Sequence, residues 1–156
     1  LGNEHIDPRP GLVVQMLEDL GEQGSIVAFN QSFEISRIKE LAKDFDDFSE
    51  RLLKLIPRFK DLIEPFRNLG YYHPDMNGSF SIKSVLPALF PNDPELDYKN
   101  LEIQNGGMAM DTFANLHQLK DPSQRDSIRQ ALLAYCRLDT LAMVRIYEEL
   151  SQTINE

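Results

Sequence analysis

The spacing of apolar residues along the chain predicts several helices around one short, buried strand. Residues 26–29 form a compact apolar run that ends at Asn30, as is typical of a buried strand. Elsewhere the apolar residues recur every three to four positions, which indicates amphipathic helices. These helices are expected at roughly residues 10–20, 32–41, 46–56, 81–86, 108–116, 124–137 and 140–151.

Prolines predict how the remaining segments are organised. Residues 1–10 are polar and hold two prolines, so we expect an extended connector ahead of a domain that spans residues 11–156. Residues 59–63 form either a short strand or the entry into a helix. Three prolines are expected to keep residues 87–97 irregular.

The turn after the apolar run is the first place where chemistry is expected. Ser32 is well placed to cap the following helix, and Glu34 comes one helical turn after Asn30. In α/β folds ligands bind at the C-terminal ends of parallel strands, so Asn30 and Glu34 are expected to point into such a crevice. Far downstream, Tyr135 and Asp139 are four residues apart and share one face of a helix.

These segments carry a resemblance to a known group of enzymes. Asn30-x-x-Phe33-Glu34 resembles the second motif of the DnaQ-like (DEDD) 3′–5′ exonucleases, which belong to the ribonuclease H-like superfamily. Tyr135-x-x-x-Asp139 resembles their third motif in its tyrosine form. Residues 17–150 also resemble a bacterial domain family of unknown function placed near those exonucleases. The segments that match that family are Ser81-Ile82-Lys83 and Tyr135 to Thr140.

The resemblance implies a fold class and a domain organisation. It implies a partial ribonuclease H-like, DnaQ-type domain of the α/β class, rich in helices because its N-terminal strands are absent. The exonucleases carry a first motif, Asp-x-Glu, on an opening strand, and no such motif precedes Ser25. Because the chain also begins at Leu1, we expect it to be the C-terminal portion of a larger protein.

The resemblance also implies a metal site for Mg²⁺ or Mn²⁺. Glu34 and Asp139 stand at the positions of family metal ligands, although the family more often has Asp where Glu34 stands. Asp61 matches a further acidic position and is a weaker third candidate. Such hard cations prefer the oxygen ligands that Asp and Glu supply. Tyr135 resembles the tyrosine that orients the attacking water.

Several of the candidate residues have more than one interpretation. Asn30 and Lys83 are candidate substrate-binding residues, and Lys83 would contact phosphate near a helix start, although it is equally an ordinary exposed lysine. Tyr135 and Asp139, taken by their spacing alone, are typical of a phenol at the core edge beside a surface acid. Cys136 has no partner arrangement for catalysis and is expected to be a buried structural thiol.

Composition narrows the class of protein. The formal net charge is −9, from 25 acidic and 16 basic residues, which argues against a broad basic surface for nucleic acid. No apolar run approaches the roughly 18 residues of a membrane span, so no membrane association is expected. A single cysteine indicates a reducing compartment, and we expect a cytoplasmic protein.

The sequence therefore predicts a fragment of a metal-dependent 3′–5′ exonuclease-like domain that acts on DNA or RNA. The isolated chain is expected to be inactive, because the missing Asp-x-Glu pair normally lies at the centre of the site. The alternative is a nuclease-like module that binds nucleic acid or a partner protein without cutting. An Asp-x-Glu strand upstream of Leu1 would favour the enzyme, and its absence would favour the binding module.

A geometric prediction follows from the two motifs. If they form one site, the carboxylates of Glu34 and Asp139 should face a common cleft, with Tyr135 on its rim. Their placement on opposite faces of the domain would contradict the exonuclease hypothesis.

Overall fold

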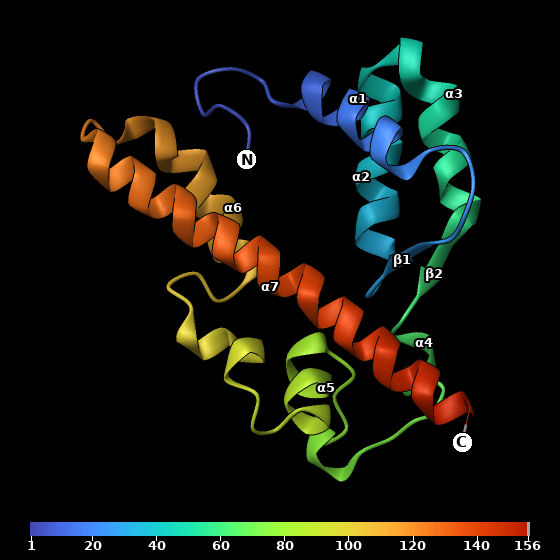
Figure 1. Cartoon of the computed structure of the whole chain (residues 1–156). Helices are drawn as coiled ribbons and strands as arrows, with labels where there is room; N and C mark the ends of the chain where they lie inside the picture. The colour runs from blue at the N-terminus through green and yellow to red at the C-terminus, as the bar shows by residue number, and fades with distance from the viewer. Residues whose placement is uncertain (156) are drawn as a thin grey trace.

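One long helix extends across the whole molecule. In the computed structural model, which describes residues 1–155, α7 (Pro122–Asn155) has 34 residues and runs diagonally through Figure 1. At about 1.5 Å per residue, such a helix is about 50 Å long. The predicted break between residues 137 and 140 is therefore wrong. No Gly or Pro follows Pro122, so nothing in this part of the sequence interrupts helical hydrogen bonding.

Three helices form a first group around their own apolar core. They are α1 (Arg9–Leu20), α2 (Ser32–Asp44) and α3 (Asp46–Leu55), seen together at the upper right of Figure 1. Each contributes apolar residues at helical spacing, which places them on one face. The buried residues of this core are Val13, Leu17, Ile38, Ala42, Leu52 and Leu55.

Two short strands pair in parallel beside this group. β1 (Ile26–Ala28) pairs with β2 (Phe59–Asp61), and Ala28 lies opposite Asp61 in the register. The connection between them consists mainly of α2 and α3, since a parallel pair needs a long crossover. The strand predicted at residues 26–29 is confirmed, and of the two interpretations of residues 59–63 the strand is correct.

A second group of helices surrounds a second core against α7. It comprises α4 (Glu64–Arg67), α5 (Ile82–Leu89) and short 3-10 turns at Pro94–Leu96 and Tyr98–Asn100, whereas α6 (Gly106–Asn115) contacts α7 without contributing a residue to this core. Helix α5 includes Pro87 in its last turns, so residues 87–97 are less irregular than expected. The buried residues of this core are Leu62, Phe66, Met76, Val85, Leu86, Ala88, Leu96, Tyr98, Leu138, Ala142 and Ile146.

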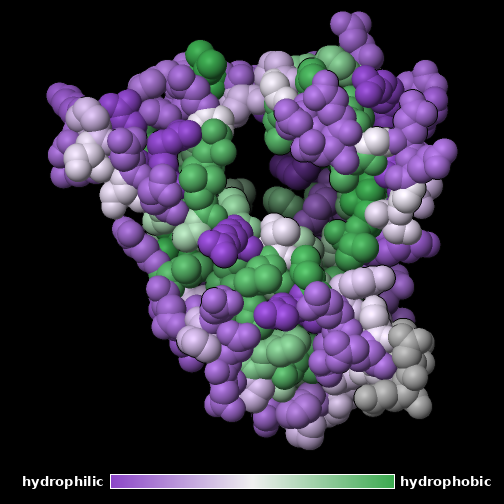
Figure 2. Space-filling model, viewed as in Figure 1, coloured by the Kyte–Doolittle hydropathy of each residue, from purple (hydrophilic) through white to green (hydrophobic). Residues whose placement is uncertain are grey.

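The strands connect the two cores. Ile26 and Phe59, at the start of the strands, pack against the first core. Phe29 packs against the second core, and Leu62 is one of its buried members. Elsewhere the two groups separate, and Figure 2 shows an open gap between the α1–α3 group and the N-terminal half of α7.

The N-terminal segment closes one end of this gap. Glu4 forms ion pairs with Arg125 and Arg129 of α7, with N–O distances of 3.2 and 3.0 Å. Arg129 also donates hydrogen bonds to the backbone carbonyls of Leu1 and Gly2. Residues 1–8 contain no regular helix or strand, but they are fastened to α7 rather than free. The predicted domain end, Glu156, lies outside the described residues.

Arg58 fastens the turn between α1 and β1. Its guanidinium donates hydrogen bonds of 2.6–2.8 Å to four backbone carbonyls, those of Leu20, Gly21, Gln23 and Gly24. These carbonyls include the C-terminal end of α1, where a cation is favoured by the helix dipole. Arg58 thus fixes the path by which the chain enters β1.

Among the helices that the structure describes, none has both the length and the apolar character required to cross a membrane.

The Arg58 contacts generate a stability prediction. Replacing Arg58 by Ala leaves four carbonyls without their charged donor, so the free energy of unfolding should fall by about 2–4 kcal/mol. Urea denaturation followed by circular dichroism measures this change. Arg51→Ala, on the exposed face of α3, is the control and should stay within about 0.5 kcal/mol of the wild type. Equal effects of the two substitutions would contradict the role given to Arg58.

Candidate functional site

The Asp61 carboxylate organises the turn that follows β1. Oδ1 accepts the backbone N–H of Asn30 at 2.7 Å, and Oδ2 accepts that of Gln31 at 2.9 Å. Oδ1 also accepts the N–H of Ile63 at 3.2 Å. The Asp61 side chain, rather than that of the expected cap Ser32, therefore accepts backbone hydrogen bonds just before α2. Ser32 is instead the first helical residue, and its hydroxyl donates to the Asn30 side chain at 3.1 Å.

This hydrogen bonding holds Asn30 in an uncommon backbone conformation. Its φ is +65°, in the left-handed region that Asn tolerates better than most residues. The turn redirects the chain sharply from β1 into α2. It thereby places Glu34 in the first turn of α2, beside Asp61, whose negative charge acts on it. The Asn30 residue itself is exposed.

Glu34 is the least satisfied polar group at this edge of the sheet. Its Oε2 atom is buried, and no hydrogen-bond partner reaches it from the described residues. Burial raises the pKa of the Glu34 carboxyl above its ordinary value, and the nearby Asp61 carboxylate raises it further, while a backbone hydrogen bond opposes them. A carboxyl group with one buried oxygen that lacks a hydrogen-bond donor favours either a proton or a cation.

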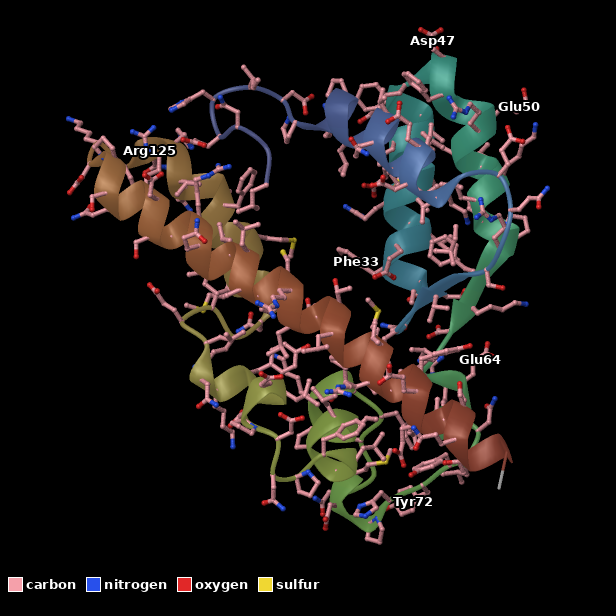
Figure 3. All side chains as sticks on the ribbon, in the orientation of Figure 1. Phe33, Asp47, Glu50, Glu64, Tyr72 and Arg125 are labelled. Atoms are coloured by element: carbon pink, nitrogen blue, oxygen red, sulfur yellow. The ribbon has the colours of Figure 1, made fainter. Side chains whose placement is uncertain are left out.

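An exposed aromatic side chain lies next to Glu34. Phe33 is 54% exposed, and Figure 3 shows it on the first turn of α2, directed toward the gap between α2 and α7. The Arg37 guanidinium lies 5.5 Å from the centre of its ring. This edge of the sheet therefore presents a carboxylate, an aromatic face and a cation within two turns of one helix.

A second polar group surrounds Asp139 on α7. The Tyr98 hydroxyl donates a hydrogen bond of 2.6 Å to Asp139 Oδ1. The Tyr98 ring centre is 6.1 Å from that of Tyr135, which lies one turn before Asp139 on the same helix. Burial and the Asp139 carboxylate raise the pKa of both tyrosines well above the ordinary value, so both hydroxyls keep their protons at neutral pH.

Lys83 belongs to the same group through an aromatic contact. Its ammonium lies 5.8 Å from the centre of the Tyr98 ring, within the range of a cation–π interaction. Lys83 and Tyr98 also line a pocket of about 530 Å³, together with Asn105 and residues of the 91–100 segment. Lys83 is exposed, and no acidic side chain in the described part of the chain pairs with it.

The candidate residues thus fall into two groups. Asn30, Glu34 and Asp61 lie at the ends of the strands, while Lys83, Tyr135 and Asp139 gather around Tyr98. Within residues 1–155 no hydrogen bond or ion pair connects the two groups. They nevertheless flank one core, because Phe29 packs against the cluster that contains Leu138. The common cleft for Glu34 and Asp139 stays a prediction.

The side-chain donor atoms of the candidate residues limit where a metal ion could bind. Across the described residues, no group of three or more His, Cys, Asp or Glu side chains is arranged to hold a metal ion. Three backbone N–H groups already use the Asp61 carboxylate, which has about four lone-pair sites. Glu34 Oε2, in contrast, is buried and has no hydrogen-bond donor among the described residues.

Near Tyr135 and Asp139 the structure differs from the sequence-based predictions in two respects. Cys136 is exposed, so the prediction of a buried thiol is wrong. The α7 face that is buried carries Leu138 and Ala142, and Cys136 points away from it. Tyr98 was not predicted at all, because its partner Asp139 is 41 residues away and no local pattern connects them.

The Glu34 environment generates a pH-dependent prediction. Since its pKa is raised in the folded chain, the ionised form disfavours folding at neutral pH and the penalty disappears below its ordinary pKa of about 4.3. Glu34→Gln should therefore be more stable than the wild type at pH 7, and this advantage should shrink as the pH falls to 4. Urea denaturation of both proteins at several pH values measures the difference. An advantage that does not vary with pH would contradict the burial of this carboxylate.

Comparisons with known proteins place the chain among bacterial relatives. The uncharacterized protein UU173 of Ureaplasma parvum is 27% identical over 151 residues, which cover 87% of this chain and 22% of that protein. The MG366 homolog of Mycoplasma pneumoniae, also uncharacterized, is 29% identical over 134 residues, which cover 80% of this chain and 20% of that protein. The chain thus spans about a fifth of the length of these curated relatives. No solved structure matches it.

A comparison with family profiles gives the family. Residues 1–81 match a family described as a domain of unknown function, DUF2779. This match confirms the predicted resemblance to a bacterial family of unknown function, whereas neither the description nor the relatives' names indicate a DnaQ-like exonuclease. The match covers more than half of the sequence, and the chain therefore belongs to the DUF2779 family.

Proposed function

We propose that this chain is part of a metal-dependent 3′–5′ exonuclease-like domain of the ribonuclease H-like type, which acts on nucleic acid. Glu34 and Asp139 would be its contribution to a site for Mg²⁺ or Mn²⁺, with Asp61 as a weaker ligand. The remaining ligands would come from parts of a longer protein, since the relatives are about five times as long as the region they share with this chain.

The observation that carries the proposal is the unpartnered Glu34 oxygen. A buried carboxylate oxygen without a donor is costly, by about 1–3 kcal/mol or more for a charged group. Glu34 lies at the C-terminal end of a parallel strand pair, where open α/β sheets bind their ligands. A divalent cation would give this oxygen the positive partner that the described residues do not supply.

The other candidate residues have compatible roles. Mg²⁺ or Mn²⁺, when bound, would activate water and stabilise the charge that develops on a phosphodiester. Tyr135 keeps its proton, because its pKa is raised, so it would orient a water molecule by hydrogen bonding rather than remove a proton. Asn30 and Lys83 are exposed and polar, and they would contact the nucleic acid.

A non-catalytic module is the second candidate. Asp139 Oδ1 already accepts a hydrogen bond from Tyr98, and Asp61 is occupied by backbone N–H groups. In this second candidate, both carboxylates would have a structural role only. A domain that keeps the fold of a nuclease and binds nucleic acid or a protein without cutting would need no carboxylates free to bind a metal ion.

Metal affinity tests the ligand assignment. With only part of a ligand set, the isolated chain should bind Mn²⁺ in the millimolar range, because the cation keeps most of its waters. Calorimetric titration should show weaker binding for Glu34→Gln and for Asp139→Asn. Glu50→Gln, an exposed change on α3, is the matched control and should bind as the wild type does. A micromolar site that survives Glu34→Ala and Asp139→Ala together would show that other residues are the ligands.

Nuclease assays test the proposed activity. The isolated chain should not degrade single-stranded DNA or RNA above background, because missing ligands cost several orders of magnitude in rate. A longer protein that includes this segment should trim 3′ ends in Mg²⁺ or Mn²⁺ and lose this activity on Asp139→Ala. Oligonucleotides labelled at the 3′ or 5′ end distinguish the direction. A longer protein that binds the oligonucleotide but never cuts it would favour the non-catalytic module.

A further inference from the structure

The pocket of about 530 Å³ is lined by α5 and by the segment that connects α5 to α6 (Figure 1). Its volume lies within the range of about 300–1,000 Å³ that is typical of small-molecule sites. Part of its wall consists of the apolar rings of Pro87, Phe90 and Pro91. Flat apolar surfaces of this kind pack well against a planar ring in a ligand.

Hydrogen bonds within the connecting segment hold the pocket wall in one shape. The Asn100 side-chain amide donates to the backbone carbonyl of Pro94 at 3.2 Å. The Gln104 amide donates to the carbonyls of Lys99 and Leu101, at 3.3 and 3.1 Å. Because these bonds already order the wall, a ligand that enters the pocket loses less affinity to the ordering of the chain.

Two lysines of the pocket have no acidic partner. Lys83 on α5 and Lys99 on the connecting segment both line it, and both are exposed. In the described part of the chain, neither forms an ion pair with a carboxylate. Lys83 lies 5.8 Å from the centre of the Tyr98 ring, a contact that leaves its positive charge in place. Both ammonium groups are therefore available to an anionic group such as a phosphate.

Two carboxylates line the same pocket without pairing with these lysines. Asp93 Oδ1 accepts the backbone N–H of Glu95 at 2.9 Å. Asp97 Oδ1 accepts that of Lys99 at 2.9 Å. Each bond fixes a carboxylate at the start of a 3-10 turn, and a carboxylate has about four lone-pair sites, so both can still accept a hydrogen bond from a ligand.

We propose that this pocket binds a nucleotide whose base carries an amino group. The phosphate contacts Lys83 and Lys99, the base packs against Phe90, and its amino group donates to Asp93 or Asp97. An amino acid also joins an anion to an N–H donor, but it fills less of the pocket and only some amino acids carry a flat ring. A free mononucleotide and the phosphorylated end of a nucleic-acid strand present the same chemistry. The proposal goes beyond the proposed function, because it needs neither a metal ion nor cleavage.

Titration of the chain with cytidine 5′-monophosphate tests the proposal, by calorimetry and by NMR of the backbone amides. EDTA is present throughout, so that no divalent cation takes part. The signals of residues 83–105 should shift, while those of α1 to α3 should not. Cytidine, which lacks the phosphate, should bind at least about tenfold more weakly. Uridine 5′-monophosphate has an acceptor oxygen in place of the amino group and should bind at least about threefold more weakly.

Lysine substitutions test where the phosphate lies. Lys83→Ala and Lys99→Ala should each weaken the binding of cytidine monophosphate by about threefold to tenfold, because each removes one positive charge beside the phosphate. The binding of cytidine should change little. Lys39→Ala, an exposed change on α2, removes the same charge away from the pocket and should leave both affinities as they are in the wild type. Circular dichroism checks that all three variants keep the helix content of the wild type.

Several results would overturn the proposal. They are unshifted signals at residues 83–105 in millimolar cytidine monophosphate, equal affinities for this ligand and cytidine, equal affinities for the cytidine and uridine nucleotides, and equal losses in the three lysine variants. Any of these results leaves the proposed function untouched, because neither metal binding nor cleavage is measured. Failure of a longer protein to cut nucleic acid likewise leaves this proposal untouched.

A phosphorylated dinucleotide distinguishes the two sources of the ligand. The probe is the cytidine dinucleotide with a 5′-phosphate, titrated under the same conditions. Binding at least as tight as that of cytidine monophosphate supports the end of a nucleic-acid strand as the ligand. Binding that is at least about tenfold weaker supports a free mononucleotide, because the second nucleotide then does not fit beside the first.

Discussion

The hydrogen bonds from the Asn30 and Gln31 backbones to Asp61 are the constraint on which this structure depends most. They join the last residue of β2 to the two residues that precede α2, which lie 30 and 31 positions earlier in the chain. Two strands of three residues each make few ladder bonds, so a short parallel pair needs such support. The same contact sets the left-handed Asn30 turn and therefore the direction of Glu34. The Asp61 carboxylate thus contributes both to the stability of the strand pair and to the placement of the candidate site residue Glu34.

The strand pair also explains how two separate cores behave as one molecule. The first residues of the strands pack against the α1–α3 core, and the residues that follow the strands pack against the core of α5 and α7. Away from the strands, the N-terminal segment provides the second connection, through Glu4 and the two arginines of α7. The open gap of Figure 2 lies between these two connections, with Phe33 at its border.

The two groups of candidate residues differ in how completely they are satisfied. Asp139 is bonded and enclosed by two tyrosines, whereas Glu34 carries a buried oxygen without a donor. Burial without a partner is tolerated where a ligand or a proton completes the site, and such groups concentrate at functional positions. The unequal satisfaction of the two carboxylates supports a site that other parts of a longer protein, or a bound cation, would complete.

The sequence by itself determined the elements whose signals are local. The apolar run at residues 26–29 and the 3.6-residue periodicity of α1 to α3 specify a strand and helices with little help from elsewhere. The spacing of Tyr135 and Asp139 placed both on one face of a helix, because residues four apart are neighbours there. The expected kinship with a bacterial family of unknown function is shown by the match over residues 1–81, although the motif segments at residues 81–83 and 135–140 lie almost entirely outside that match.

Only the tertiary structure decided the contacts between distant segments. Asp61 replaced Ser32 as the partner of the α2 start, and Tyr98 met Asp139 from 41 residues away. Cys136 proved exposed, since the buried face of α7 is set by the helices that pack against it rather than by its own sequence. Such partners depend on which distant segments the tertiary fold brings together. The local periodicity and spacing of the sequence do not specify these long-range contacts. Local propensity determines an element, whereas burial and hydrogen bonding across the fold determine what each side chain does.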